Sequence, residues 1–247
     1  MLLRRVIEHV KAQNWTAVSI DFVIVVAGVL LALWASEWAA ARQGLAAAKR
    51  AQDTIETELF DASRAVYNFN SSIPCSLELL SALEAALVSD GQTPEILTQD
   101  RGFIPFGLVI PPTLARDQAT ASGAMAHVPR DKQVAYRSVY GRLETIGEIT
   151  GRLNERADVF APLIMGRPMT EPERNAMLSD LRWMRTRLRI VESVSEQMFD
   201  ELAPLDLEQR IDPRRAEEFS VIINELREVY GGCVRPPDIE PYKDYVE

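Results

Sequence analysis

The sequence predicts an all-α protein in which an N-terminal single transmembrane helix continues into an antiparallel helical bundle. Three observations predict this fold class. A charge-free apolar run covers residues 22–36, the rest of the chain repeats apolar residues in steps of three and four, and no run of comparable length has the strand period of two. Sequential amphipathic helices joined by short connections favour an antiparallel bundle.

The apolar run has the length and the flanks of a membrane span. Its fifteen charge-free residues correspond to about 22 Å of helix, and extension to residues 17–41 reaches 25 residues, enough for a hydrocarbon core of ~30 Å. Two carboxylates, Asp21 and Glu37, each lie eight residues from the midpoint Val29, about 12 Å from the bilayer centre and close to the headgroups. We expect five residues at the membrane interfaces, namely Trp15, Asp21, Trp34, Glu37 and Trp38.

A cleaved signal peptide is the main alternative interpretation of this region. The arginines at positions 4 and 5, the apolar run and the alanines at 39–41 imitate its three parts. Acidic Glu8 in the lead and the bulky Trp38 beside the alanines argue against cleavage. A buried core helix is disfavoured, because nothing else in the chain is apolar enough to surround it. Residues 1–14 are either a short interfacial helix or a basic, solvated cytoplasmic lead.

The net charge and the cysteines indicate where the rest of the chain, residues 42–247, lies and which partners it disfavours. The net charge of −9 belongs entirely to residues 42–247, which disfavours nucleic acid as a partner. Arginine and lysine flank both ends of the span and do not settle its orientation. Cys75 and Cys233, each expected just beyond a helix end, suit a disulfide in an oxidising compartment, which would put the N-terminus in the cytoplasm. Two buried free thiols are the alternative.

Residues 42–233 form the predicted bundle domain. The membrane helix is expected to continue to Pro74 with a stripe from Leu45 to Ile73, and a second helix to begin at the N-cap Ser76 and end before Asp90. The apolar segment 103–110, inside the proline- and glycine-rich stretch 91–113, is expected to cover the bundle as a lid or to form a partner-binding patch.

The later helices have the clearest periodic signals. One stripe runs from Tyr136 to Ile164. A capping box at Thr170, with Pro172 among the first helical residues, opens a stripe that ends at Leu202. A last helix is expected from Pro213 to the glycines at 231 and 232, before a proline-rich acidic tail, 234–247, that is disordered or forms an extended strap held by Cys233.

A search for catalytic or cofactor chemistry finds little. His9 precedes the span and His127 follows it, so the two histidines do not share a metal, and no nucleotide, hydrolase or zinc motif is present. His127 with Asp131 is interpreted as a surface contact rather than an acid/base pair. The arginines between 182 and 189 precede glutamates at helical spacing and are interpreted as a solvated salt-bridge face, with an anion site as the alternative. We therefore expect no enzyme, no cofactor and no metal.

The anchor also offers two functional hypotheses. Six small residues follow one another at a spacing of four, which favours close approach of membrane helices: Gly28, Ala32, Ser36, Ala40, Gly44 and Ala48. Asp21, at the inner edge of a single span, resembles the acid of the small subunits of proton-driven stator complexes. An interfacial acid facing water is the alternative for Asp21.

The span also resembles a family. The segment DFVIVVAGVLLAL at 21–33, followed by Trp38 and by Ala41-Arg42, is similar to DFVIVVVGVFIGLQ and VNNWNEAR in a bacterial family of uncharacterised single-pass membrane proteins, a domain-of-unknown-function family. A weaker similarity covers residues 121–125, and residues 36, 37, 39 and 40 depart from the family's asparagines and glutamate. The resemblance implies a membrane location and no activity.

From the sequence we expect a single-pass protein of the bacterial inner membrane, with a cytoplasmic N-terminus and a periplasmic bundle that acts as an interaction or scaffold module. Its expected partners are the lipid bilayer and either a second copy of the chain or another membrane protein. A stator-like proton-channel subunit and a ligand-sensing bundle are the alternatives. The arginine face or the 103–110 loop would form the pocket of the ligand sensor.

Overall fold

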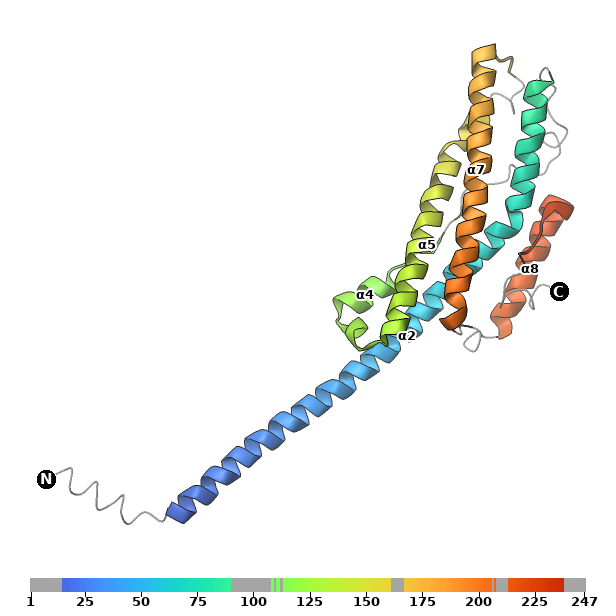
Figure 1. The fold of residues 1–247 in the computed structure, drawn as a ribbon. Helices are drawn as coiled ribbons and strands as arrows, with labels where there is room; N and C mark the ends of the chain where they lie inside the picture. Colours follow the sequence, from blue (N-terminus) through green and yellow to red (C-terminus); the bar gives the residue numbers. More distant parts are fainter. Residues whose placement is uncertain are drawn as a thin grey trace.

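The computed structural model describes residues 15–89, 108, 110–111, 113–160, 167–205, 207 and 213–237. All regular structure in these ranges is helical, which confirms the predicted fold class (Figure 1). The α-helices are α2 (Trp15–Val88), α4 (Ala115–Ala121), α5 (Arg130–Glu155), α7 (Glu171–Leu202) and α8 (Pro213–Tyr230). Short 3-10 turns are η1 (Ala124–His127), η2 (Ala157–Phe160), η3 (Ala203–Leu205) and η5 (Gly231–Cys233).

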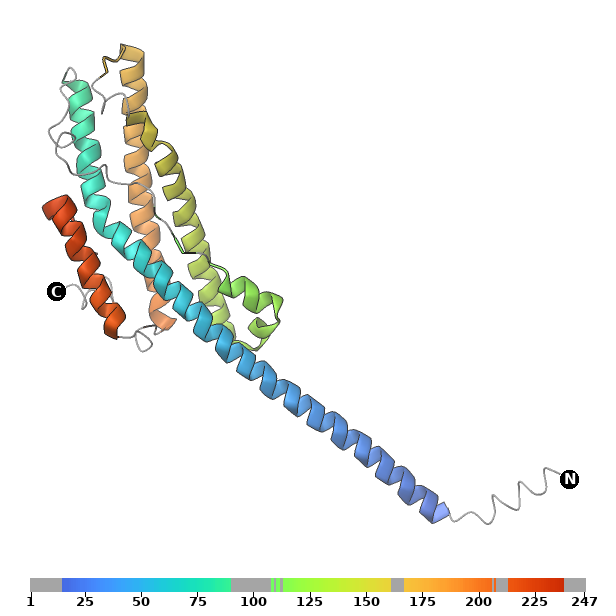
Figure 2. The same ribbon diagram turned by 180° about the vertical axis from the view of Figure 1, so that it is seen from behind.

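Helix α2 is a single element that leaves the bundle and carries the apolar segment (Figures 1 and 2). Its 74 residues correspond to about 110 Å of helix. Residues from Ser19 to Ala46 are exposed apart from Gly44, and burial begins at Ala48. Leu45, which we expected to begin the buried stripe, is also exposed. The buried stripe of the lower bundle follows the predicted period: Ala48, Ile55, Leu59, Ala62, Val66, Phe69 and Ile73.

The predicted break at Pro74 was wrong. Pro74 lies inside α2, so no second helix begins at Ser76, and Cys75 is an interior residue rather than one beyond a helix end. A proline removes one backbone hydrogen bond and disfavours the preceding turn, which here bends the helix instead of ending it (Figure 1). The reason is packing on both sides of the proline: Ile73 before it and Leu80, Leu83 and Leu87 after it are all buried in the same core.

Helices α2, α5 and α7 form the core, and α8 covers α2 from another side (Figures 1 and 2). Helix α7 runs opposite to its neighbours, because its N-terminus lies near the end of α2 and its C-terminus near the start of α5. Two ion pairs fix this register: Arg156, directly after α5, with Asp180 of α7 (2.9 Å), and Arg142 of α5 with Glu201 of α7 (3.2 Å). The bundle is therefore antiparallel where α7 joins it, as predicted.

The predicted stripe that begins at Tyr136 is confirmed as far as Phe160, and so are the stripe and the capping box of α7. The Thr170 side chain accepts a hydrogen bond from the Glu173 amide, the Glu173 carboxylate accepts one from the Thr170 amide, and Pro172 lies in the first turn. Helix α5 ends at Glu155, earlier than expected, although Phe160 of η2 still enters the core. Helix α7 buries its stripe as predicted: Met177, Leu181, Met184, Leu188, Val191, Ser195, Met198 and Leu202.

The outer segments are described in part. Helix α8 starts at Pro213 and ends before Gly231, whose φ of 79° suits a glycine at a helix end. From the apolar loop, Leu108 and Ile110 pack against the core, in the manner of the predicted lid. The lead at 1–14, residues 90–107, Ile164 and residues 238–247 lie outside the described part of the chain.

Candidate functional site: the membrane anchor and its junction with the bundle

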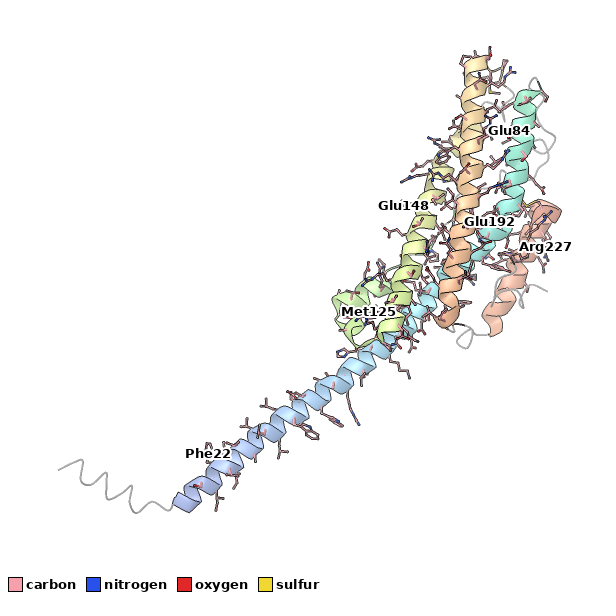
Figure 3. The ribbon with its side chains drawn as sticks, viewed as in Figure 1. Phe22, Glu84, Met125, Glu148, Glu192 and Arg227 are labelled. Carbon is pink, nitrogen blue, oxygen red and sulfur yellow. A yellow bond between two sulfur atoms is a disulfide. The ribbon has the colours of Figure 1, made fainter. Side chains whose placement is uncertain are left out.

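The free part of α2 exposes an apolar surface all round. Its most hydrophobic window, of mean hydropathy 2.2, is 0% buried, and the side chains of Phe22 and Leu31 are 68% and 65% exposed (Figure 3). Soluble proteins rarely expose a continuous apolar surface of this size. By length and composition this is the one helix in the described residues able to cross a membrane. The interpretation as a buried core helix is therefore excluded.

The predicted interface residues lie at both ends of this segment. Trp34 and Trp38 follow one another at a spacing of four on the bundle side, 65% and 50% exposed, and Glu37 is exposed between them. The guanidinium of Arg42 lies 4.0 Å from the centre of the Trp38 ring, a cation–π contact. Asp21 is exposed near the other end. Trp15 begins α2, and its side chain lies outside the described atoms.

The row of small residues divides into two parts. Gly28 has no neighbour within 4 Å of a Cβ position, and Ala32, Ser36 and Ala40 are exposed. Gly44, in contrast, lies under the imidazole of His127, whose Nε2 would be 2.7 Å from a Cβ at this position. Ala48 is buried in the core. The last two members of the row therefore contact the protein's own bundle, and the members from Gly28 to Ala40 are exposed.

Glu58 joins three elements just above this contact. One carboxylate oxygen accepts hydrogen bonds from the backbone amides of Leu114 and Ala115, both 2.9 Å, at the start of α4. The other accepts a hydrogen bond from the Tyr140 hydroxyl of α5. A carboxylate at a helix N-terminus satisfies amides that have no partner inside the helix. Burial, followed by this bond to Glu58, raises the pKa of the Tyr140 phenol far above its usual range.

Glu56 forms a second, more buried contact between α2 and α5. Its side chain is 1% exposed, and one oxygen accepts hydrogen bonds from the Tyr136 hydroxyl (2.6 Å) and the Lys132 ammonium group (2.8 Å). Sequence analysis missed Glu56 and Glu58. A signal was present: glutamates two apart, next to the buried stripe of α2, and tyrosines four apart on one face of α5.

The predicted cysteine pair is bonded. Cys75 of α2 and Cys233 of η5 form a disulfide across 158 residues of sequence, with Cα atoms 4.9 Å apart. The chain then continues along α2, because the Arg235 amide donates to the Ser71 carbonyl (3.0 Å) and the Tyr67 hydroxyl donates to the Pro237 carbonyl (3.1 Å). Residues 234–237 are thus an extended strap, the second of the two alternatives for the start of the tail.

The arginine face of α7 binds α2. Arg185 lies 2.6 Å and Arg182 3.4 Å from the carboxylate of Glu84, near the end of α2 (Figure 3). The hydrogen bond from Arg185 is the main cause that lowers the pKa of Glu84. Arg187 and Arg156 both lie over the Trp183 ring. These arginines therefore have partners on neighbouring helices and on Trp183, rather than the glutamates that follow them.

Two shallow hollows lie beside Pro111. One, of about 530 Å³, is lined by acids and threonines of α2, and the other, of about 410 Å³, lies between Arg116, Asp117 and Glu144. Within the described ranges no group of histidine, cysteine and carboxylate side chains has the arrangement of a metal site. His127 is exposed, with its ring over Gly44.

Comparison with family models, with curated proteins and with solved structures found no match to this chain. The family resemblance of the anchor therefore stays a prediction.

Proposed function

We propose that the protein is a single-pass protein of the bacterial inner membrane whose helical bundle is an interaction or scaffold module, held outside the cytoplasm directly at the membrane surface. One observation supports this proposal most: α2 runs unbroken from the exposed apolar segment into the core of the bundle. A segment with this surface requires a lipid environment. Because the same helix carries the core, the bundle has no flexible tether.

The continuity of α2 also favours a retained span over a cleaved signal. Cleavage after the alanines at 39–41 would cut within a regular helix, three residues before the His127 contact at Gly44. A signal peptide is normally followed by a mature N-terminus that is independent of it. The protein is therefore proposed to keep residues 15–41 as its anchor.

The disulfide supports the orientation. Bonds such as Cys75–Cys233 form and persist in oxidising compartments and are rare in the bacterial cytoplasm. The bundle is accordingly proposed to lie on the periplasmic side, and the N-terminal lead in the cytoplasm.

A scaffold role agrees with how the described polar groups are used. The buried carboxylate of Glu56, the partly buried carboxylate of Glu58 and the arginines facing Glu84 join helices to one another. The surface open to a partner in the membrane is the row from Gly28 to Ala40, which supports self-association or binding to another membrane helix.

Two measurements on the full-length protein test this proposal. The protein should stay in the membrane after alkaline carbonate extraction, and the bundle should become accessible to protease only when the outer membrane is opened. Cysteine alkylation of the same fractions, without reductant, should leave Cys75 and Cys233 unlabelled. Release of the bundle into the soluble periplasm would show instead that the span is cleaved. A bundle that stays protected from protease and whose cysteines are labelled would lie in the cytoplasm, opposite to the proposed orientation.

A further inference from the structure

The part of the bundle nearest the proposed membrane is the corner formed by α4 and η1. Figures 1 and 2 show this corner as the first part of the bundle beside α2 as the helix leaves its exposed segment, and Figure 3 shows Met125 there. The corner contacts α2 at Gly44. Gly44 is six residues, about 9 Å of helix, beyond Trp38, the residue expected at the interface. The headgroup layer on one side of a bilayer is about 5–8 Å thick. The η1 end of the corner therefore lies at the outer edge of the headgroups, whereas the start of α4, held by Glu58, lies farther from the membrane.

The charge of this zone is opposite to that of the whole chain. Residues 38–52 of α2 and residues 118–130 contain no aspartate or glutamate, although the chain has 36 of them and a net charge of −9. The same two segments contain four basic residues, and all four are exposed: Arg42, Lys49, Arg50 and Arg130. The acid of α4, Asp117, lies 3.1 Å from the guanidinium group of Arg116, and Asp131 directly follows Arg130. A local excess of positive charge beside the span fits the negative surface of anionic phospholipids.

The corner is also shaped for close approach to a surface. The exposed residues of the turn from α4 into η1 are short, namely Ala121, Ser122, Gly123 and Ala126, so at this turn the backbone can come close to a surface. Glu58 ties the start of α4 to α2, and His127 covers Gly44, so the corner is fixed to the helix that enters the membrane. Because the corner is fixed to α2, is flanked by basic residues and has short side chains on its turn, it is a docking surface rather than a flexible tail.

We propose that the α4–η1 corner rests on the headgroups of anionic phospholipids, that Lys49, Arg50 and Arg130 lie within about a Debye length of this charged surface and are attracted to it, and that the contact sets the angle between the bundle and the membrane. This inference depends on the proposed membrane span. The partner is the lipid surface itself. A second copy of the chain covering the same corner is the competing occupant, and the experiment distinguishes the two.

The experiment uses the full-length, disulfide-bonded protein in vesicles. An environment-sensitive fluorophore is attached to Ala126→Cys, and a matched sample carries it at Ser89→Cys, at the far end of α2. Quenching is measured with a spin label on the lipid headgroup, in phosphatidylcholine vesicles and in vesicles with 30 mol% phosphatidylglycerol, a fraction chosen to be on the order of that in anionic membranes. We expect the label at 126, and not that at 89, to be quenched more in the anionic vesicles and less in about 1 M salt.

A charge variant makes the test specific. Lys49→Gln with Arg50→Gln should lower the ratio of molecules whose corner rests on the headgroups to molecules whose corner does not, by about fivefold for each charge. The double variant should therefore largely lose the dependence of quenching on anionic lipid. The control, Arg152→Gln with Arg189→Gln, changes the net charge equally and should leave quenching unchanged. Arg152 pairs with Glu148, and Arg189 is three residues before Glu192; Figure 3 shows both glutamates farther along the bundle than Met125 of the corner.

Two results would overturn the inference while the membrane span remains intact by carbonate extraction. One is quenching at position 126 that does not depend on lipid charge. The other is a disulfide between the Ala126→Cys residues of two copies, formed equally in both kinds of vesicle. Loss of the protein from the vesicles on extraction would instead refute the proposed span, so the two failures are distinguishable.

Discussion

Single side chains decide how the bundle is attached to its anchor. Glu58 binds the amides of Leu114 and Ala115 with one oxygen and the Tyr140 hydroxyl with the other, so one carboxylate joins α2, α4 and α5. None of these contacts follows from the periodicity of the sequence, because Glu58 is next to the stripe residue Leu59 and resembles an ordinary exposed glutamate.

Replacement of Glu58 by alanine should destabilise the bundle by about 2–4 kcal/mol, because a helix cap and a charge-assisted hydrogen bond are lost together. The measurement is denaturant unfolding of the full-length protein in detergent, followed by circular dichroism. Glu144→Ala, an exposed glutamate on α5, is the matched control and should stay within about 0.5 kcal/mol of the wild type. Equal losses in both variants would contradict the assigned role of Glu58.

Tyr140 should make the protein sensitive to alkali. Its pKa is raised in the folded state from the ordinary value of 10.0, so the folded protein keeps the phenol proton that the unfolded chain loses. This contribution to stability is complete below about pH 10 and decreases as the pH rises above that value. We expect Tyr140→Phe to be less stable than the wild type at pH 8, and the difference to shrink between pH 10 and 11 in parallel unfolding curves. A constant difference would contradict the assignment.

At the scale of elements, the disulfide and the strap secure the bend of α2. Pro74 removes a backbone bond, and immediately beside it Cys75 binds Cys233 while the Ser71 carbonyl accepts the Arg235 amide. The strap thus supports the turn of α2 that proline weakens. This arrangement explains why the predicted helix end at Pro74 was wrong although the two stripes around it were correct.

Replacement of both cysteines by serine should destabilise the protein by about 2–5 kcal/mol, since the bond closes a loop of 158 residues. Hydrogen exchange should then accelerate first in α8 and in residues 234–237, and later in α5 and α7, because the hydrophobic cluster around the disulfide is formed by residues of α2, α8 and η5 and by Val234. Uniform acceleration throughout the bundle would instead show that α8 is part of the central folding unit.

The exposed part of the small-residue row is the element expected to self-associate. Ala32→Leu should reduce dimers captured by in-membrane crosslinking several-fold, because a larger side chain keeps two helices apart. Leu30→Ala, on another face of the same helix, should have little effect. Gly44→Ala should also leave the dimers unchanged, because that position faces His127 of the same chain. Equal effects of Ala32→Leu and Gly44→Ala would show that the row acts as a whole.

At the scale of the whole molecule, the anchor and the bundle are one body because α2 belongs to both. Insertion of Gly-Gly-Ser-Gly after Ala41 should leave membrane insertion and bundle stability unchanged, but should broaden the distances between a spin label on the bundle and one in the span. An insertion of four alanines at the same site, which preserves the helix, is the control and should keep a narrow distribution. Similar broadening in both would show that the junction is already flexible.

Much of this architecture could be predicted from the sequence, because helical period and capping are local signals. The stripe from Met177 to Leu202 and the capping box at Thr170 are examples. What could not be predicted depends on contacts between distant residues. The burial of Glu56 needs Lys132 and Tyr136, the continuity through Pro74 needs the strap, and the role of Gly44 needs His127. The row of small residues was one pattern in the sequence but serves two different surfaces.

The unbroken helix also gives the protein a fixed height. From Trp38 to Val88 α2 spans about 75 Å, so with the proposed span the far end of the bundle, where α2 ends and α7 begins, would stand at most that far above the lipid. A domain on a flexible linker sweeps a volume and meets partners at many distances. A bundle held by a continuous helix would meet only partners that lie at its own height above the membrane.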